Sequence, residues 1–380
     1  MIKKYVVLLL SISIYTSLEG QVLNLNNIIQ AKCDTGNISL AFEAIPSPPI
    51  ASFYLMSELH QVMVNPYLQV EFVKYLSKQR NLKYIVLEMS HSNAFLYNEF
   101  LENGDTAFLR WIAYDGRHSP IYFSKLYDYN KKLAKEMKLT FLGVDVIMSN
   151  KETFKKAIKQ FFQISINQEH CKKINSLFQE VALTTTVEGL EEQKNKIKST
   201  ILSDTTLYAK VFSTKFYDLK IILTNISTDK GRRDDEMFDN FKNIIEIKKL
   251  NSATSFFGSF GNSHVQLLSK KDCFRKYLED FSFFAPVKKV SIIGVQYYNC
   301  YALHDSVHIK NDGIFSSYSS SLKRINKKDL DNIEEYATNC KSNISIFPIY
   351  QATKLAPQGQ QSTFSKLDYL IICKDFQPLH

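Results

Sequence analysis

The fold of this chain is constrained most strongly by a series of short apolar runs, each rich in β-branched and aromatic residues. Most runs are continuous rather than alternating with polar residues, which is typical of strands buried on both faces of a parallel sheet. We therefore expect a core of buried strands. The runs cover residues 51–56, 84–87, 140–146, 255–260, 290–295, 344–349 and 367–372.

Helical patterns separate the first of these runs and cover residues 66–79, 94–103 and 121–137. Strands and helices that alternate along a chain favour parallel βαβ units, with helices packed on both faces of the sheet. The sequence therefore predicts an α/β fold, a three-layer sandwich around a largely parallel central sheet.

Residues 151–250 have a different pattern. This stretch is helical, polar and rich in lysine, contains no proline and has only weak strand signals. We interpret it as a helical insertion between the third and fourth core strands. The predicted organisation is a single α/β domain over residues 21–380 with a helical insertion at about 151–250.

The first twenty residues resemble a secretory signal peptide. Lys3 and Lys4 precede an apolar core over residues 6–14, and a short polar stretch follows. An apolar run of about ten residues is too short to span a bilayer. We therefore predict that residues 1–20 are a signal peptide, that the protein is exported to the periplasm or secreted, and that no transmembrane anchor remains after cleavage.

The cysteines leave two alternatives open. An even number in an exported chain permits up to three disulfides, whereas buried thiols with at most one bridge are equally compatible with the sequence. None of the cysteines forms a CxxC pair, so a thiolate zinc site is not expected. The six are Cys33, Cys171, Cys273, Cys300, Cys340 and Cys373.

The formal net charge is +9, but the lysines are spread along helical stretches among Glu, Gln and Phe. No nucleic-acid module is recognisable, and aromatic residues are not interleaved with arginines in a binding pattern. Diffuse basicity of this kind is typical of a solvated surface. The predicted partner is therefore a small-molecule or peptide substrate, and no nucleic acid.

Four successive apolar runs end in titratable residues. Glu58 and His60 follow the first run, Glu88 the second, Asp145 the third and His264 the fourth. A single histidine after a strand is more often structural, but ligands of α/β sheets gather at the carboxyl ends of parallel strands. We therefore predict that His60 and His264 share one active site with Glu88.

The chemistry open to such a cluster is limited. A neutral imidazole can act as general base on water, and a neighbouring carboxylate fixes its tautomer. His60, Glu88 and His264 are equally the candidate ligands of a divalent metal. The sequence has no GxSxG elbow, no GxGxxG and no P-loop, so neither a serine nucleophile nor nucleotide-dependent chemistry is expected.

A second cluster begins with Arg233 and Asp234, at the start of an amphipathic run. Asp234 could serve only as a helix cap and Arg233 could be solvated, but a helix entering the mouth of the sheet could aim the guanidinium at a developing oxyanion. We predict His60, Glu88, His264 and Arg233 as catalytic residues. Glu58, Asp145 and Asp234 are the predicted substrate-binding residues. His91 is either a helix-start residue or a further ligand.

The order of these motifs resembles the erythromycin esterase-like family, whose relatives include Tiki/TraB-type proteins and haem-binding ChaN-like proteins. The resemblance covers residues 53–267 and also matches Asn130, Gly143, Met237 and Gly261 to family positions. The motifs that carry it are "SELH", "VLEMSH", "LYDYNKKLAKEMKLTFLGVDV", "RRDDEMFDN" and "SFFGSFGNSHV".

The resemblance implies an exported hydrolase that activates water against an ester or amide bond. Ser57 stands where the family usually has Gly, and the late turn reads Gly-x-x-His, as in Tiki/TraB-type proteins. A metallopeptidase-like enzyme with a divalent metal is therefore one alternative. A non-catalytic protein that binds haem or another small ligand is the second, and a structural protein with incidental histidines is the third.

Overall fold

The computed structural model describes the chain from residue 31 to residue 375 with gaps. The predicted signal peptide, residues 1–20, lies outside the described residues, so cleavage and export stay predictions. No helix within the described ranges combines the length and the hydrophobicity needed to cross a membrane. The described ranges are 31–33, 38–109, 120–146, 151–225, 231–265, 272–284, 289–302, 307–313, 335–349 and 367–375.

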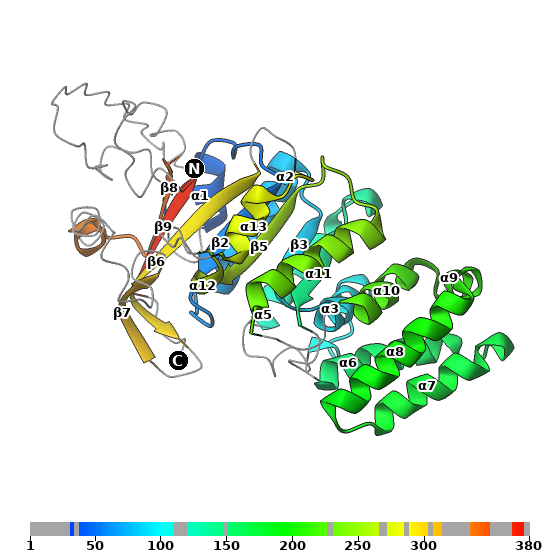
Figure 1. Ribbon diagram of the computed structural model, residues 1–380. Coiled ribbons are helices and arrows are strands. Elements are labelled where there is room, and N and C mark those ends of the chain that lie inside the picture. The colour runs from blue at the N-terminus through cyan, green and yellow to red at the C-terminus, as the bar shows by residue number, and fades with distance from the viewer. Residues whose placement is uncertain are drawn as a thin grey trace.

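A single sheet organises the molecule, and nine strands of it lie in the described ranges. These are β1 (Ala31–Cys33), β2 (Phe53–Glu58), β3 (Tyr84–Ser90), β4 (Thr140–Asp145), β5 (Phe256–Gly261), β6 (Val290–Ala302), β7 (Val307–Gly313), β8 (Ile344–Pro348) and β9 (Tyr369–Lys374). Their order across the sheet is β1-β8-β9-β6-β2-β5-β3-β4, and β7 pairs with β6 (Figure 1). All neighbours from β9 to β4 run parallel, whereas β1, β7 and β8 pair antiparallel with their neighbours.

Each of the seven predicted apolar runs overlaps one of these strands, and the predicted α/β class with a largely parallel sheet is confirmed. β1 and β7 were not expected from the sequence. β7 pairs with the second half of β6, which continues well past the run that ends at residue 295.

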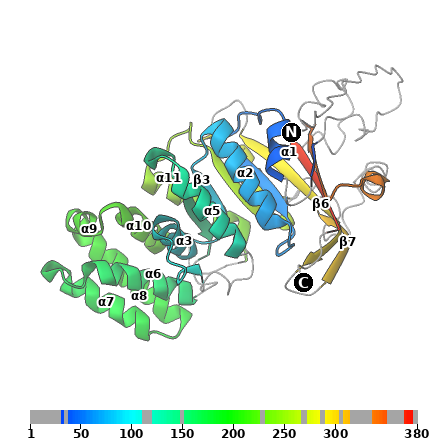
Figure 2. The same ribbon diagram turned by 180° about the vertical axis from the view of Figure 1, so that it is seen from behind.

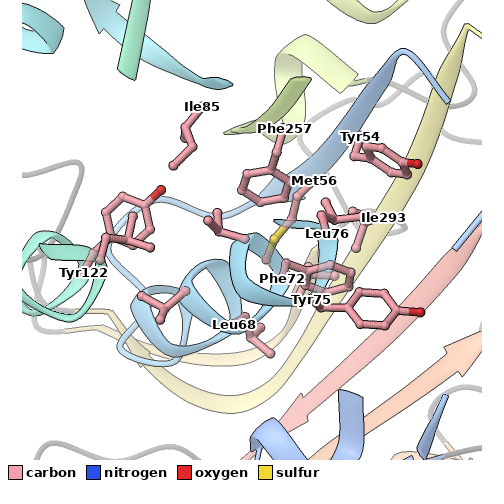
Figure 3. Close-up of a cluster of buried hydrophobic side chains, with 14 of the residues drawn as sticks. Tyr54, Met56, Leu68, Phe72, Tyr75, Leu76, Ile85, Tyr122, Phe257 and Ile293 are labelled. Atoms are coloured by element: carbon pink, nitrogen blue, oxygen red, sulfur yellow. The ribbon is translucent and has the colours of Figure 1, made fainter. Parts of the chain in front are cut away.

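Helices cover both faces of the sheet, and the pleat of the strands decides which side chains meet them (Figures 1 and 2). Tyr54 and Met56 of β2 pack into a core with the helices of one face (Figure 3), whereas Phe53 and Leu55 pack into a second core on the other. The first face carries α1 (Ile38–Ala44), α2 (Asn65–Arg80) and α5 (Pro120–Lys132), and the second carries α11 (Arg233–Lys248) and α13 (Phe274–Asp280). The result is the predicted three-layer sandwich.

The insertion between β4 and β5 is helical and has a core of its own. It packs on α3 (His91–Asn103) through Phe95 and Leu96, which belong to the core cluster of the insertion. Helix α11 falls within residues 151–250 but packs on the sheet instead. The helices of the insertion are α6 (Lys151–Ser165), α7 (Lys172–Leu183), α8 (Val187–Ser203), α9 (Thr205–Phe212) and α10 (Phe216–Thr224).

Short elements complete the description: the 3₁₀ helices η4 (Lys135–Met137), η6 (Glu169–Cys171) and η7 (Ser213–Lys215), and the four-residue helix α12 (Asn262–Val265). No disulfide joins the five cysteines whose side chains are described, and all five are buried thiols. The side chain of Cys33 lies outside the description. Of the two alternatives for the cysteines, the structure therefore has the buried thiols.

Candidate active site

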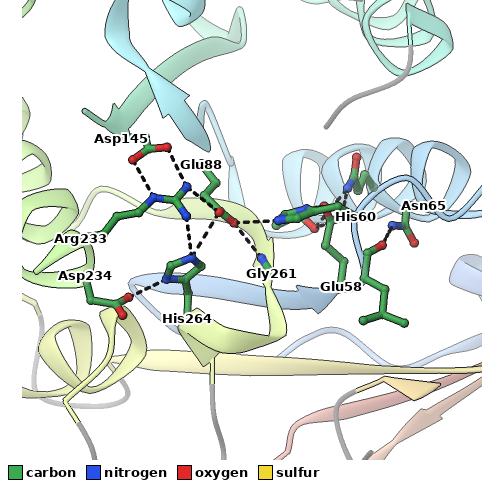
Figure 4. A network of polar contacts seen from close by, with 12 residues as sticks. Glu58, His60, Asn65, Glu88, Asp145, Arg233, Asp234, Gly261 and His264 are labelled. Atoms are coloured by element: carbon green, nitrogen blue, oxygen red, sulfur yellow. Dashed lines mark hydrogen bonds and ion pairs between the residues drawn. The ribbon is translucent and has the colours of Figure 1, made fainter. Parts of the chain in front are cut away.

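The four strands that end in titratable residues are neighbours in the sheet. Their order is β2-β5-β3-β4 and all three pairs are parallel, so their carboxyl ends meet at one edge. Because β5 lies between β2 and β3, the turn after β5 comes between the residues that follow the other two strands. One connected network (Figure 4) contains all seven predicted site residues: Glu58, His60, Glu88, Asp145, Arg233, Asp234 and His264.

Glu88 is the centre of this network. Its Oε1 lies 2.9 Å from Nη2 of Arg233 and 3.2 Å from Nε2 of His264. Its Oε2 accepts a hydrogen bond of 2.8 Å from the backbone N–H of Gly261 and lies 3.5 Å from Nε2 of His60. The residue is only 2% exposed. Burial alone would raise the pKa of Glu88, but hydrogen bonds from His264 and His60 hold that pKa well below its ordinary value.

His60 is the accessible histidine of the site, with 33% of its side chain exposed. Its Nδ1 lies 3.0 Å from Oε1 of Glu58, so this carboxylate, rather than Glu88, fixes the orientation of the ring. Burial lowers the pKa of His60, but the hydrogen bonds with Glu58 and Glu88 outweigh burial and raise the pKa to about 10. The imidazole is therefore protonated at neutral pH.

Glu58 is itself held by two side chains that the sequence analysis did not single out. Ser259 of β5 donates a hydrogen bond of 2.6 Å to Oε2 of Glu58, and Gln69 of α2 donates to the same oxygen. Gln69 also donates to Oγ of Ser259 at 3.1 Å. The only sequence signal for these two residues is that each is polar within an otherwise apolar stretch. Since Glu58 is buried and its oxygens are engaged, it reaches a bound molecule only through His60.

The turn that carries His60 is held in place by hydrogen bonds from buried side chains. Asn65 donates a hydrogen bond of 2.6 Å to the carbonyl oxygen of Leu59, and the hydroxyl of Tyr297 donates one of 2.7 Å to Oδ1 of Asn65. Gln61 follows with a left-handed φ of 65°. The hydrogen bonds fix the backbone directly before the histidine.

His264 lies deeper than His60. Its Nδ1 is 2.7 Å from Oδ1 of Asp234, which also accepts a hydrogen bond of 2.9 Å from the backbone N–H of Phe274. Burial lowers the pKa of His264, but hydrogen bonds with Asp234 and Glu88 raise it to about 9. Both imidazoles of the site are thus cationic at neutral pH.

Arg233 is the first residue of α11 and joins two buried carboxylates. Its Nε and Nη2 donate to Oδ1 and Oδ2 of Asp145 at 3.0 Å and 2.7 Å, a bidentate geometry, and Nη2 also donates to Glu88. Its Nη1 lies 3.5 Å from Nε2 of His264. Burial lowers the pKa of Arg233, but Asp145 and Glu88 outweigh burial and raise the pKa above its ordinary value. The guanidinium is therefore a fixed positive charge.

Two glycines are required by close approach. A Cβ at position 261 would lie 2.9 Å from Nε2 of His60, so any larger residue there would displace the imidazole. A Cβ at position 143 would lie 2.2 Å from the carbonyl oxygen of Ser90, within the sheet just below the site. Asn130 acts at a distance from the site: its Oδ1 accepts the N–H of Leu139 and fixes the turn before β4.

The donor set does not resemble a metal centre. Within the described ranges, no group of three or more His, Cys, Asp or Glu side chains is arranged to hold a metal ion. Glu88 already faces a guanidinium and two imidazoles, so a divalent cation at His60, Glu88 and His264 would have to displace a proton from each imidazole and the contact of Glu88 with Arg233. The metal expected as one alternative therefore has no prepared ligand set in this part of the chain.

His91 lies outside the network. It is fully buried as the first residue of α3, with Nε2 3.1 Å from Oδ1 of Asp218 and Nδ1 accepting the N–H of Gly143 at 3.3 Å. Asp218 also accepts a hydrogen bond of 2.9 Å from Lys248. Burial lowers the pKa of His91 despite its carboxylate partner. Of the two alternatives for this residue, the structure has the helix-start position.

Comparisons with known proteins show the fold. No protein family and no curated protein sequence matches this chain. Among solved structures, a protein from Bacillus cereus superposes with a TM-score of 0.52 at 15% identity, covering 90% of this chain and 97% of the other. A mutant of the erythromycin esterase EreC in its open conformation superposes with a TM-score of 0.51 at 13% identity, covering 92% and 98%. The haem-binding ChaN of Campylobacter jejuni reaches 0.29 at 16% identity over 70% and 90%. The first two share the overall fold with this chain.

Proposed function

We propose that this protein is an exported hydrolase of the erythromycin esterase-like type, which activates water at His60 against an ester or amide bond. The observation that carries the proposal is the setting of His60. Its ring is fixed at Nδ1 by a buried carboxylate and a third of its side chain is exposed, while Nε2 lies 3.5 Å from a buried Glu88 that has its own cationic partners. A general base requires this combination of fixed orientation and access to water. The shared fold with an erythromycin esterase and the order of the motifs support the same reaction class.

The reaction follows from the atoms of this site. Neutral His60 takes a proton from water at Nε2, the water oxygen bonds to the carbonyl carbon, and the carbonyl oxygen takes up the negative charge. When the tetrahedral intermediate collapses, the bond to the leaving alcohol or amine breaks, and the leaving group takes the proton from His60. Glu58 holds the ring in place and stabilises its protonated form.

The remaining residues provide positioning and charge. Asp145 fixes the guanidinium of Arg233, which neutralises Glu88 and leaves Nη1 as its least engaged nitrogen toward a developing oxyanion. Asp234 holds His264 in the same way that Glu58 holds His60, and His264 donates to Glu88. Glu58, Asp145 and Asp234 therefore act through other residues, instead of contacting substrate as the sequence analysis expected.

The direct test is hydrolysis of p-nitrophenyl esters and p-nitroanilides by the purified chain. We expect turnover by the wild type and a loss of roughly 10²–10⁴-fold in kcat for His60→Ala, as for removal of a general base. A His60→Ala protein with wild-type thermal melts and retained hydrolysis would refute the role of His60.

The two alternatives have their own measurements. Activity lost on exhaustive chelation and restored by a divalent metal would favour the metallopeptidase-like alternative over this mechanism. A haem titration that produces a Soret band in the wild type but not in His60→Ala would favour the binding protein. We expect neither outcome, because both ring nitrogens of His60 face carboxylates.

A further inference from the structure

Asn262 differs from the other buried asparagines near the sheet edge because both of its amide atoms lack a partner in the described ranges, whereas Asn93, near the end of β3, lacks one at Nδ2 alone. Asn262 is 6% exposed, and within the described part of the chain neither Oδ1 nor Nδ2 has a hydrogen-bond partner. Asn65 and Asn240, which are buried close to the same edge, both have partners: Asn65 bonds Leu59 and Tyr297, and Asn240 donates to the carbonyl oxygen of Val144. A buried amide without partners costs free energy, and such groups in native proteins call for an explanation.

The position of Asn262 points to the missing partner. It directly follows Gly261, whose N–H donates to Glu88 and whose missing Cβ makes room for Nε2 of His60. Gly261 therefore lies against the nitrogen that would take a proton from water, and Asn262 is the next residue along the chain. His264, two residues later, closes the other side of Glu88.

The proposed reaction needs hydrogen-bond donors to the developing oxyanion, and the charged residues of the site supply only some of them. Arg233 has Nε and Nη2 engaged by Asp145 and Glu88, and its Nη1 lies 3.5 Å from His264. Both imidazoles already face carboxylates on each side. Acyl transfer uses preorganised N–H donors at the position where the oxyanion develops, and a neutral side-chain amide serves as such a donor.

We propose that Asn262 is a catalytic residue whose Nδ2–H group donates a hydrogen bond to the carbonyl oxygen of the scissile ester or amide as it becomes the oxyanion. This inference rests on the proposed hydrolase function and deepens it. The site keeps the amide without a protein partner because its partner is the substrate oxygen. The unpartnered amide lowers the free energy of unfolding, and its hydrogen bond to the oxyanion stabilises the transition state.

The test compares Asn262→Leu with Asn225→Leu, measured on p-nitrophenyl acetate together with thermal melts. Asn225 is a matched control: it is fully buried, both of its amide atoms lack partners in the described chain, and it follows α10 in the helical insertion. Leucine keeps the branching at Cγ and removes the unsatisfied groups but is larger, so the thermal melts show whether each buried site accommodates it. We expect Asn262→Leu to lower kcat roughly 10²–10³-fold with little change in KM, as for loss of an oxyanion donor. Asn225→Leu is expected to leave kcat unchanged.

A folded Asn262→Leu protein with the kcat of the wild type overturns the proposal. If leucine prevents folding, Asn262→Ala removes the same donor with a smaller side chain and is judged by the same loss of kcat. His60→Ala, run in parallel, separates the two proposals. Loss of activity in His60→Ala alone leaves the hydrolase standing and removes Asn262 from it, whereas loss in Asn262→Leu alone removes His60 as the base.

A second measurement does not depend on turnover. Phenyl methylphosphonate, a stable anion with the shape of the tetrahedral intermediate, is titrated into each protein by calorimetry. We expect the wild type and Asn225→Leu to bind it alike and Asn262→Leu to bind it at least about tenfold more weakly, the usual effect of losing a hydrogen bond to a charged group. A wild-type protein that neither hydrolyses the ester nor binds the phosphonate overturns both proposals.

Discussion

Two clusters of histidine and charged side chains lie next to strand β3. β3 carries Glu88, the centre of the candidate site, and it ends one residue before His91. Each cluster joins histidine, carboxylate and a basic side chain: His60 and His264 with Glu88 and Arg233 in one, His91 with Asp218 and Lys248 in the other. By composition the two are nearly interchangeable.

Their surroundings differ in two respects. The site lies at the carboxyl edge of the sheet with His60 partly exposed, whereas His91 is fully buried and joins α3 to residues of α10 and α11. His60 is partly exposed and faces carboxylates at both ring nitrogens, which raise its pKa, whereas burial lowers the pKa of His91, whose Nδ1 accepts an N–H from Gly143. The difference teaches that burial and the partner of each ring nitrogen, not the kind of residues nearby, separate a reactive histidine from a structural one.

The largest expected effect comes from amidating the central carboxylate of each cluster. Glu88→Gln removes the charge that holds Arg233, His60 and His264 together, and we expect kcat for ester hydrolysis to fall about 10³-fold, within the range for acid–base machinery. Asp218→Asn makes the same change in the other cluster and is expected to leave kcat unaltered. Equal losses of kcat in the two variants would contradict the assignment of one cluster to catalysis and the other to structure.

The basic residue of each cluster gives the next test. Arg233→Lys keeps the charge but cannot form the bidentate contact with Asp145, so the site loses its alignment and kcat is expected to fall about 10²-fold. Lys248→Arg is the counterpart and is expected to preserve activity. Retention of full activity in Arg233→Lys would mean that the fork geometry of the guanidinium has no role.

Substitution of the histidine in the buried cluster is expected to lower stability without lowering activity. His91→Leu leaves the buried N–H of Gly143 without its acceptor and removes a donor from Asp218, which costs about 2 kcal/mol of unfolding free energy. Esterase activity in this variant is expected to match the wild type. The measurement is the midpoint of urea unfolding, and an unchanged midpoint would show that His91 is not structural.

The pH dependence of stability has opposite signs in the two clusters. The pKa values of His60 and His264 are raised to about 10 and about 9, so their contribution is complete below about 6.5 and is lost as the pH rises to 9–10. The pKa of His91 is lowered, so its contribution is present above about 6.5 and is lost as the pH falls.

Melting temperatures measured from pH 5 to pH 10 test these signs. We expect His60→Leu to reduce the loss of stability on the alkaline side and His91→Leu to reduce the loss on the acid side. Should both variants change the same side of the profile, the assignment of protonation states is wrong.

Much of this arrangement could be predicted from the sequence. The continuous apolar runs gave the strands, and the titratable residues after them marked the edge where the network lies. Solvation of Arg233 was the simpler expectation from composition, yet Arg233 bridges Asp145 and Glu88. Its role depends on where α11 begins relative to the sheet, which no local pattern specifies.

Other features could not be predicted because they depend on strand order. β5 is inserted between β2 and β3, although it follows β4 in the chain, and this places Ser259 beside Glu58 and Gly261 beside Glu88. His91 shows the converse limit: it follows a strand as closely as the site residues do, but helix α3 carries it to the other cluster. Proximity in sequence to a strand end therefore does not by itself place a residue in the site.

The most direct test of His60 as the base is the pH dependence of kcat/KM for p-nitrophenyl acetate, corrected for hydroxide-catalysed hydrolysis. Because the pKa of His60 is raised to about 10 and the base must be neutral, we expect kcat/KM to rise with pH and level off near that value. Glu58→Gln removes one of the hydrogen bonds that raise this pKa, so its rising limb is expected at lower pH. A profile that is flat from pH 6 to 10, or one that Glu58→Gln does not shift, would contradict the account.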